Sequence, residues 1–250
     1  MINITFSTIT FIFASKVKKV ATNEKYCICE QCEFRHIVFS NLSESEIQEL
    51  CNHKEEQSFR KGEVILHQGE KINNFKYLKS GLVKIYRRVA DEEEQIITIT
   101  KPFEFVSNMS IFETDRYQFS VSALEDSVVC VVDIGYIKSL LLRNGGFAIS
   151  LLTRIAGITD KIITQSLDIR QRNLTGRVAY VLLYFAREIY NSHIFDLPVS
   201  RKEIADYIGM STANVIRTLS EFKNDGIIKT YGKTIEISDI KKLELFSERG

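Results

Sequence analysis

The stretch from Ser200 to Ile237, SRKEIADYIGMSTANVIRTLSEFKNDGIIKTYGKTIEI, constrains the fold of this chain more than any other. Ser200 and Glu203 have the spacing of a capping box, which predicts the start of an α-helix. Gly209 is expected to end that helix, because glycine adopts the left-handed conformation of a helix C-terminus without strain. Ser211 can cap a second helix directly afterwards. The pattern therefore predicts two short helices joined by a tight turn.

The second of these helices is expected to present a polar surface near its N-terminus. Its apolar side chains should face inward: Val215, Leu219 and Phe222. The N-terminal part of a recognition helix reads base edges in the major groove of DNA. Arg217 has the chemistry for a bidentate contact to guanine, and Asn214 for a contact to a base or a phosphate. The expected DNA-binding residues are Arg201, Ser211, Thr212, Ala213, Asn214, Arg217 and Lys233.

The segment IIKTYGKTIEI, which follows Gly226, predicts a two-stranded hairpin that turns at Tyr231-Gly232-Lys233. A hairpin after two such helices is a wing, and Lys233 at its tip could meet a DNA phosphate. Small helix-turn-helix units also serve as protein-binding modules. The wing, together with a dimerisation helix ahead of it, favours DNA binding.

Short strands are predicted in the N-terminal half. The segments GEVILHQGE, YLKSGLVKIYRRV, EEEQIITIT and FSVSALEDSVVCVVD are separated by Gly, Asn and Asp turns. Even spacing of short strands is typical of a barrel or sandwich. Ser43 and Glu46 form a further capping box, which predicts a short helix ahead of the strands.

A long helix is predicted from Gly146 to Ile169, where apolar residues fall at helical spacing. At about 1.5 Å per residue it would be roughly 35 Å long. It is too apolar to cover one small barrel alone, which favours dimerisation through a second copy of the same helix. The alternative is a core helix between two domains. The expected dimer interface consists of Phe147, Leu151, Ile155, Ile158 and Ile162, and a second apolar set widens the stripe: Ile149, Leu152, Ala156 and Ile163.

Composition and charge agree with a globular regulator. The 250 residues are 44% hydrophobic and 26% charged. From Arg170 onward, 13 Lys and Arg face 10 Asp and Glu, a net charge of +3 that permits a nucleic-acid face. No stretch reaches the roughly 18 apolar residues of a membrane span, and the N-terminal apolar segment has its lysines on the wrong side for a secretory signal. The sequence therefore predicts a cytoplasmic protein with no membrane partner.

The motifs together resemble the Crp/Fnr family of bacterial transcription regulators, from about Cys29 to Ile237. The segments GEVILHQGE, LKSGLVKIYR, ALEDSVVCVVD and the stretch from Ser200 onward look like that family's motifs in the family's order. The resemblance implies an α+β fold with an N-terminal β-roll (a jelly-roll-like barrel), a long dimerisation helix and a C-terminal winged helix-turn-helix. It also implies a homodimer on a two-fold symmetric operator, and RNA polymerase as a partner if the protein is an activator.

The implied domains are an N-terminal extension that is not native or is disordered (1–25), a sensor β-roll with a cysteine cluster (26–145), a dimerisation helix (146–170) and a winged helix-turn-helix (171–250). The chain is predicted not to be an enzyme. The alternative is a small β-barrel metalloenzyme with an accessory domain, which would need clustered ligands. The four histidines are scattered instead: His36, His53, His67 and His193.

Two positions depart from family members that bind cyclic AMP. Those members use a Gly-Glu pair for the ribose and an Arg-Ser pair for the phosphate, whereas the positions here look like Ser107-Asn108 and Gln118-Phe119. Arginine is the natural partner of a phosphate, so cyclic AMP is not the expected effector. Many members also carry a glutamate where this chain has Ala213, which can touch a thymine methyl but cannot accept a hydrogen bond from cytosine.

The cysteines resemble the ligand set of the oxygen-sensing branch, which holds an iron–sulfur cluster with three N-terminal cysteines and a distal one. Cys29 and Cys32 resemble the start of the set and Cys130 the distal ligand, but no cysteine lies near Val38, where the third is expected. Cys27 could replace it, and Cys51 is a weaker substitute. A cluster on Cys27, Cys29, Cys32 and Cys130, a zinc site that adds His36, a thiol redox switch and no sensing role all stay open.

Overall fold

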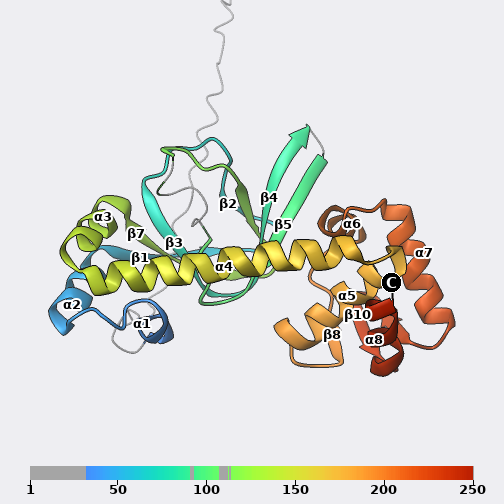
Figure 1. The fold of residues 1–250 in the computed structure, drawn as a ribbon. Coiled ribbons are helices and arrows are strands. Elements are labelled where there is room, and N and C mark those ends of the chain that lie inside the picture. Colours follow the sequence, from blue (N-terminus) through green and yellow to red (C-terminus); the bar gives the residue numbers. More distant parts are fainter. Residues whose placement is uncertain (1–31, 91–92, 107–111, 113, 250) are drawn as a thin grey trace, which may run out of the picture.

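The computed structural model describes residues 32–90, 93–106, 112 and 114–249. In the described residues, an N-terminal part contains three short helices and seven strands, and a C-terminal part carries the helix-turn-helix and its wing (Figure 1). The N-terminal elements are α1 (Glu33–Ile37), α2 (Glu44–Asn52), β1 (Lys54–Phe59), β2 (Val64–Leu66), β3 (Asn74–Ser80), β4 (Val83–Ala90), β5 (Glu93–Thr100), β6 (Ser120–Ala123), β7 (Ser127–Asp133) and α3 (Ile134–Arg143). The remaining elements are α4 (Gly145–Gln171), α5 (Leu174–Tyr184), the π-helical turn η2 (Phe185–Ile189), β8 (Ile194–Asp196), α6 (Arg201–Ile208), α7 (Thr212–Asn224), β9 (Ile228–Tyr231), β10 (Thr234–Ile237) and α8 (Ile240–Arg249).

The strands of the N-terminal part form two antiparallel sheets, with the orders β1-β7-β3 and β2-β6-β4-β5. Their core contains fully buried aromatic side chains from β3 and the segment after β5: Phe75, Tyr77 and Phe105. The predicted α+β fold with an N-terminal β-sheet domain is confirmed. The described strands form two sheets around one core, which is the sandwich of the two expected alternatives and the arrangement of a jelly roll, and they do not close into a single barrel.

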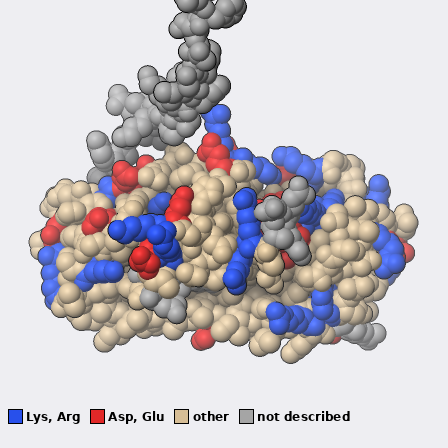
Figure 2. All heavy atoms as spheres, turned by 90° about the horizontal axis from the view of Figure 1, so that it is seen from above, with Lys and Arg blue, Asp and Glu red and all other residues tan. Residues whose placement is uncertain are grey.

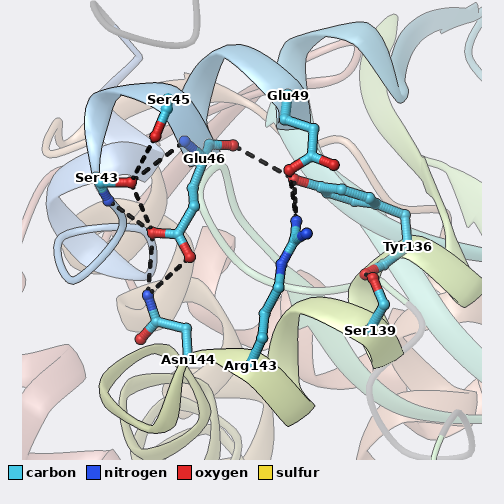
Figure 3. Close-up of polar contacts among 8 residues, drawn as sticks. All are labelled: Ser43, Ser45, Glu46, Glu49, Tyr136, Ser139, Arg143 and Asn144. Carbon is cyan, nitrogen blue, oxygen red and sulfur yellow. Dashed lines mark hydrogen bonds and ion pairs between the residues drawn. The ribbon is translucent and has the colours of Figure 1, made fainter.

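Helix α4 runs the length of the molecule and connects the two parts (Figure 1). Its start is fixed by a polar network with α2 (Figure 3). The Asn144 Oδ1 accepts a hydrogen bond from the backbone N–H of Phe147 at 2.9 Å, while its Nδ2 donates to both carboxylate oxygens of Glu46 at 3.2 and 3.1 Å. Beside it, Arg143 forms an ion pair with Glu49 at 2.5 Å. The end of α3 and the start of α4 are thereby held to α2.

The face of α4 that was predicted to form the dimer packs instead against the strands of its own chain. Phe147, Leu151 and Ile158 are buried in the core of the N-terminal part, and Ile155 and Ile162 are half-buried against that core. Phe147 and Leu151 have almost no exposed surface in the single chain, whereas Ile155, Ile158 and Ile162 keep part of theirs. A single chain does not test a contact between two copies, so an interface on this face stays a prediction. Spacing alone cannot distinguish one apolar stripe of a helix from another.

A second apolar face of α4 is open to solvent. Its large side chains are between 52% and 68% exposed: Ile149, Leu152, Ile163 and Leu167. At about 100° per residue these four positions share one side of the helix, well over 90° away from the buried side. Three of them belong to the set that the sequence showed as widening the stripe.

The C-terminal part is a winged helix with its own core. Strands β8, β10 and β9 form a small antiparallel sheet in that order, and α8 packs against α5. The aromatic rings of Phe222 in α7 and Phe246 in α8 lie 5.5 Å apart. This core also takes in five side chains from the N-terminal part: Leu82, Tyr86, Ile96, Ile99 and Leu124. In the described part of the chain, no helix is both long enough and apolar enough to cross a membrane.

Candidate DNA-binding interface and sensor site

The helix-turn-helix forms through the local signals that its sequence carries. The Ser200 Oγ accepts from the backbone N–H of Glu203 at 3.1 Å, and the Glu203 carboxylate accepts from the Ser200 N–H at 2.8 Å, which closes the predicted capping box at the start of α6. Gly209 ends α6 in the left-handed conformation at φ 65°. Ser211 then caps α7 by accepting from the N–H of Asn214 at 3.2 Å. The three predicted caps of the helix-turn-helix are therefore confirmed.

One face of α7 points away from the protein core and is available to a ligand. Ala213 and Arg217 are exposed, with 64% of the Arg217 side chain accessible, and Thr212 is half-buried beside them. Arg217 Nε lies 3.8 Å from a carboxylate oxygen of Glu221, one turn further along. The opposite face is buried, as predicted: Val215, Leu219 and Phe222.

Ile216 belongs to the same outward face and is missing from the predicted set. It is 50% exposed, although it is a large apolar residue. At about 100° per residue it lies between Thr212 and Ala213 around the helix. Its position relative to Thr212 on the helix is the signal that points to it, whereas its apolar side chain alone suggests the core.

The wing presents Lys233 at its tip, as the sequence predicts. Strands β9 and β10 pair in register, with Gly232 at φ 62° in the turn between them. The Lys233 side chain is 74% exposed and its Nζ lies 2.8 Å from the Asp196 carboxylate, which raises the pKa of the lysine. Tyr231, next to the turn, is also exposed. A DNA phosphate would have to share or replace Asp196 as the partner of Lys233.

Arg201 differs from the other predicted DNA contacts because it is partly buried. It is the first residue of α6, and burial lowers the pKa of its guanidinium from an ordinary value far above neutrality.

Seen from above, Lys and Arg side chains are spread over the visible surface and also occur on the side where Figure 1 places α6 and α7 (Figure 2). The positive charge is therefore distributed and does not form a single basic patch on this face.

The structure brings two of the predicted metal ligands into one core. Cys130 on β7 is fully buried between Glu56 of β1 and Tyr77 of β3, and Cys32, just before α1, is buried in the same core. Burial raises the pKa of the Cys130 thiol to about 11, so it is protonated at neutral pH. Cys27 and Cys29 lie outside the described residues.

A complete ligand set is not assembled from the described residues. No three or more His, Cys, Asp or Glu side chains gather there with the geometry of a metal site. Cys51 on α2 is half-buried, and His36 on α1 is exposed. Because metal ligation requires thiolates, Cys130 would have to lose its proton as a metal bound. The iron–sulfur and zinc hypotheses therefore stay predictions.

The positions expected to receive a cyclic nucleotide are described only in part. Ser107 and Asn108 lie outside the described residues, Gln118 is exposed, and Phe119 is half-buried against the sensor core. Phe119 has no polar side-chain atom to offer a phosphate. Arg116 is exposed nearby, but its guanidinium donates to the carbonyl of Gly69 at 2.8 Å.

A β-sheet domain joined by one long helix to a winged helix-turn-helix is the architecture of a class of transcription regulators. Comparison with protein families agrees with this class. Residues 56–144 match the cyclic nucleotide-binding domain, and residues 176–246 match the Crp-like helix-turn-helix domain. The chain belongs to the Crp/Fnr family of transcription regulators.

Relatives from different branches of the family are similarly distant. A CRP-like cAMP-activated global transcriptional regulator of Mycobacterium tuberculosis is 26% identical over 82% of this chain and 94% of its own length. The transcriptional activator protein FnrA of Stutzerimonas stutzeri is 25% identical over 74% of this chain and 78% of its own. FixK2 of Bradyrhizobium japonicum has the same fold, with a TM-score of 0.68 at 24% identity over 77% of this chain and 96% of FixK2. Similarity alone therefore does not assign an effector.

Proposed function

We propose that this protein is a homodimeric, sequence-specific DNA-binding regulator that reads a two-fold symmetric operator with α7 and its wing. The observation that carries the proposal is the outward face of α7, where Thr212, Ala213, Ile216 and Arg217 are accessible while the opposite face is buried. An α-helix fits the major groove, and Arg217 supplies a bidentate donor for guanine. Lys233, at the tip of the wing, supplies a phosphate contact.

Base preference follows from the side chains on that face. Ala213 and Ile216 are apolar and exposed, so they suit the methyl groups of thymines. Neither can accept a hydrogen bond from cytosine. The operator half-site is therefore expected to combine a guanine with neighbouring thymines.

The dimer is proposed to form through the exposed apolar face of α4. Ile149, Leu152, Ile163 and Leu167 are accessible along the helix, and no described element of the same chain covers them. Burying such side chains between two helices contributes about 1.5–3 kcal/mol each relative to exposure. A two-fold axis across α4 would place two recognition helices on half-sites about one DNA turn apart.

The signal is proposed to act on the N-terminal part and to reach α7 by shifting the equilibrium between two orientations of the winged helices. The Gln118-Phe119 pair argues against cyclic AMP, and the presence of Cys32 and Cys130 in one core favours a redox, oxygen or nitrosative signal received through a bound metal. Iron, acid-labile sulfide and zinc contents of protein purified without oxygen, with its visible spectrum, test this part. A colourless protein without metal would exclude the cluster.

Selection of binding sites from random DNA, followed by titration at several salt concentrations, tests the main proposal. We expect enrichment of an inverted repeat and a steep loss of affinity with salt, with a slope near −0.9 per phosphate contact. Absence of enrichment or a flat salt response would contradict DNA recognition. A helix-turn-helix that binds protein partners instead of DNA would give no enriched sequence and a flat salt response.

A further inference from the structure

Lys84 connects the sheet β2-β6-β4-β5 of the N-terminal part, called the sensor sheet below, to the first helix of the helix-turn-helix. It lies on β4, its side chain is only 10% exposed, and its Nζ donates to two carboxylates from different parts of the chain. The distance is 2.6 Å to Glu94 on β5 and 2.9 Å to Glu203 on α6. Burial alone would lower the pKa of Lys84, but hydrogen bonds to Glu94 and Glu203 outweigh it and raise the pKa. The ammonium group is therefore charged in both pairs.

Glu203 has two roles at once. One of its carboxylate oxygens accepts from the backbone N–H of Ser200 and closes the capping box of α6, while the other accepts from Lys84. The Glu203 carboxylate, which caps the N-terminus of α6, is thus also bound by Lys84 of the sensor sheet. Helix α7 follows α6 after a tight turn at Gly209 and packs against it, so the recognition helix lies one turn away from the helix that Lys84 contacts.

The surroundings of the pair make the two parts pack as one unit. The Tyr184 hydroxyl donates to the carbonyl of Ile99 on β5 at 3.1 Å, and Lys61 Nζ donates to the carbonyl of Pro198 at 2.9 Å. Apolar side chains of β4 and β5 complete the core of the winged helix. The outward face of α7, including Arg217, stays exposed in this arrangement. The contact is thus compatible with DNA binding and fixes the direction in which α7 is presented.

We propose that Lys84 is a positioning residue for DNA recognition, which holds Glu203 and thereby sets the angle and separation of the two recognition helices in the dimer. The inference rests on the proposed function, because it needs a dimer on a two-site operator. Two half-sites about one turn apart bind best to helices already held at that separation, since less orientational freedom is lost on binding. Without Lys84, each winged helix keeps its base contacts, but only the apolar core and the remaining hydrogen bonds hold its direction, which therefore varies more.

The predicted consequence is a loss of spacing discrimination. The test compares wild type and Lys84→Gln by fluorescence anisotropy at one salt concentration, on the selected operator, on operators with half-sites moved by one or two base pairs, and on a single half-site. We expect the preference for the natural spacing to fall about tenfold, within the range of couplings between contacting residues. Affinity for the single half-site should stay unchanged.

Matched variants separate positioning from damage to the fold. Lys84→Arg keeps a charged donor and should retain most of the spacing preference. Lys79→Gln removes a similar ion pair, with Glu56 at 2.8 Å, that lies wholly within the other N-terminal sheet, β1-β7-β3, so it should leave the preference unchanged. Glu203→Gln breaks the pair from the other side, while glutamine also serves in a capping box. If Lys84→Gln does not fold, the spacing preference of Glu203→Gln provides the test instead.

Three outcomes distinguish the possibilities. A drop in spacing preference with unchanged half-site affinity supports the inference. A Lys84→Gln protein with the wild-type spacing preference, or with an equal loss on every DNA including the half-site, would overturn it. Wild-type protein that binds none of these DNAs would overturn the proposed function itself, and the inference with it.

Discussion

Arg217 is the side chain on which base recognition is predicted to depend most. It lies on the outward face of α7, and its only ion pair among the described residues is a 3.8 Å contact with Glu221, so little has to be broken before it reaches DNA. Arg217→Ala is expected to weaken binding to the selected operator by about 1–3 kcal/mol. Competition titrations with operator and random DNA measure the loss.

The matched variant for this prediction is Arg217→Lys, which keeps the charge but not the planar pair of donors. Compared with Arg217→Ala, this variant should recover more of the affinity for random DNA than of the affinity for the operator. An Arg217→Ala protein with wild-type affinity and sequence preference would show that α7 does not read bases through this residue.

Cys130 illustrates how burial controls thiol chemistry. Its pKa of about 11 and its complete burial predict very slow alkylation, because the thiolate is the reactive form. In protein freed of metal with a chelator, iodoacetamide should modify the half-buried Cys51 before Cys130, which should react only after unfolding. Peptide mass spectrometry after timed labelling gives both rates. Rapid modification of Cys130 in the folded protein would mean that the N-terminal part opens readily.

Among the elements, α4 separates a property that local spacing predicts, the helix itself, from one that it does not predict, the face that packs on the sheets. The spacing of apolar residues predicted the helix, and the capping boxes at Ser43 and Ser200 predicted two others, because those signals are local. The helix has two apolar faces, and which one meets the sheets depends on strands far away in sequence. The hydrogen bonds from Asn144 to α2 and from Lys84 to α6 also join segments that are distant in sequence, and spacing within one element cannot predict them.

The exposed face of α4 makes a prediction about assembly. Ile163→Glu places a charge in the middle of the proposed interface, where burial without a partner is costly, so this variant should sediment as a monomer and lose most of its operator affinity. It should still fold, because Ile163 is exposed within its own chain. Thr164→Glu, an exposed neighbour roughly 100° around the helix, is the control that should remain dimeric. A dimeric Ile163→Glu protein would move the interface elsewhere.

At the scale of the whole molecule, the two parts share one of the two hydrophobic cores. Five side chains of the N-terminal part complete the core of the winged helix, and several hydrogen bonds cross the same boundary. A part that depends on its neighbour for its core is not expected to unfold independently. The long helix, which packs on the sheets with one face and leads into α5, adds a covalent connection between the cores.

Calorimetry can test this dependence through Ile99, a buried sensor residue whose side chain lies in the winged-helix core. Ile99→Ala should cost about 2–5 kcal/mol, which lowers Tm by roughly 4–20 °C for a protein of this size. Because the core is shared, the wild type should show a single transition, and the variant should shift it as a whole. Two separate transitions, with only one of them moved by Ile99→Ala, would show that the parts unfold independently. The sensor could then lose its fold without affecting the winged helix, and a signal could not reach α7 through this interface.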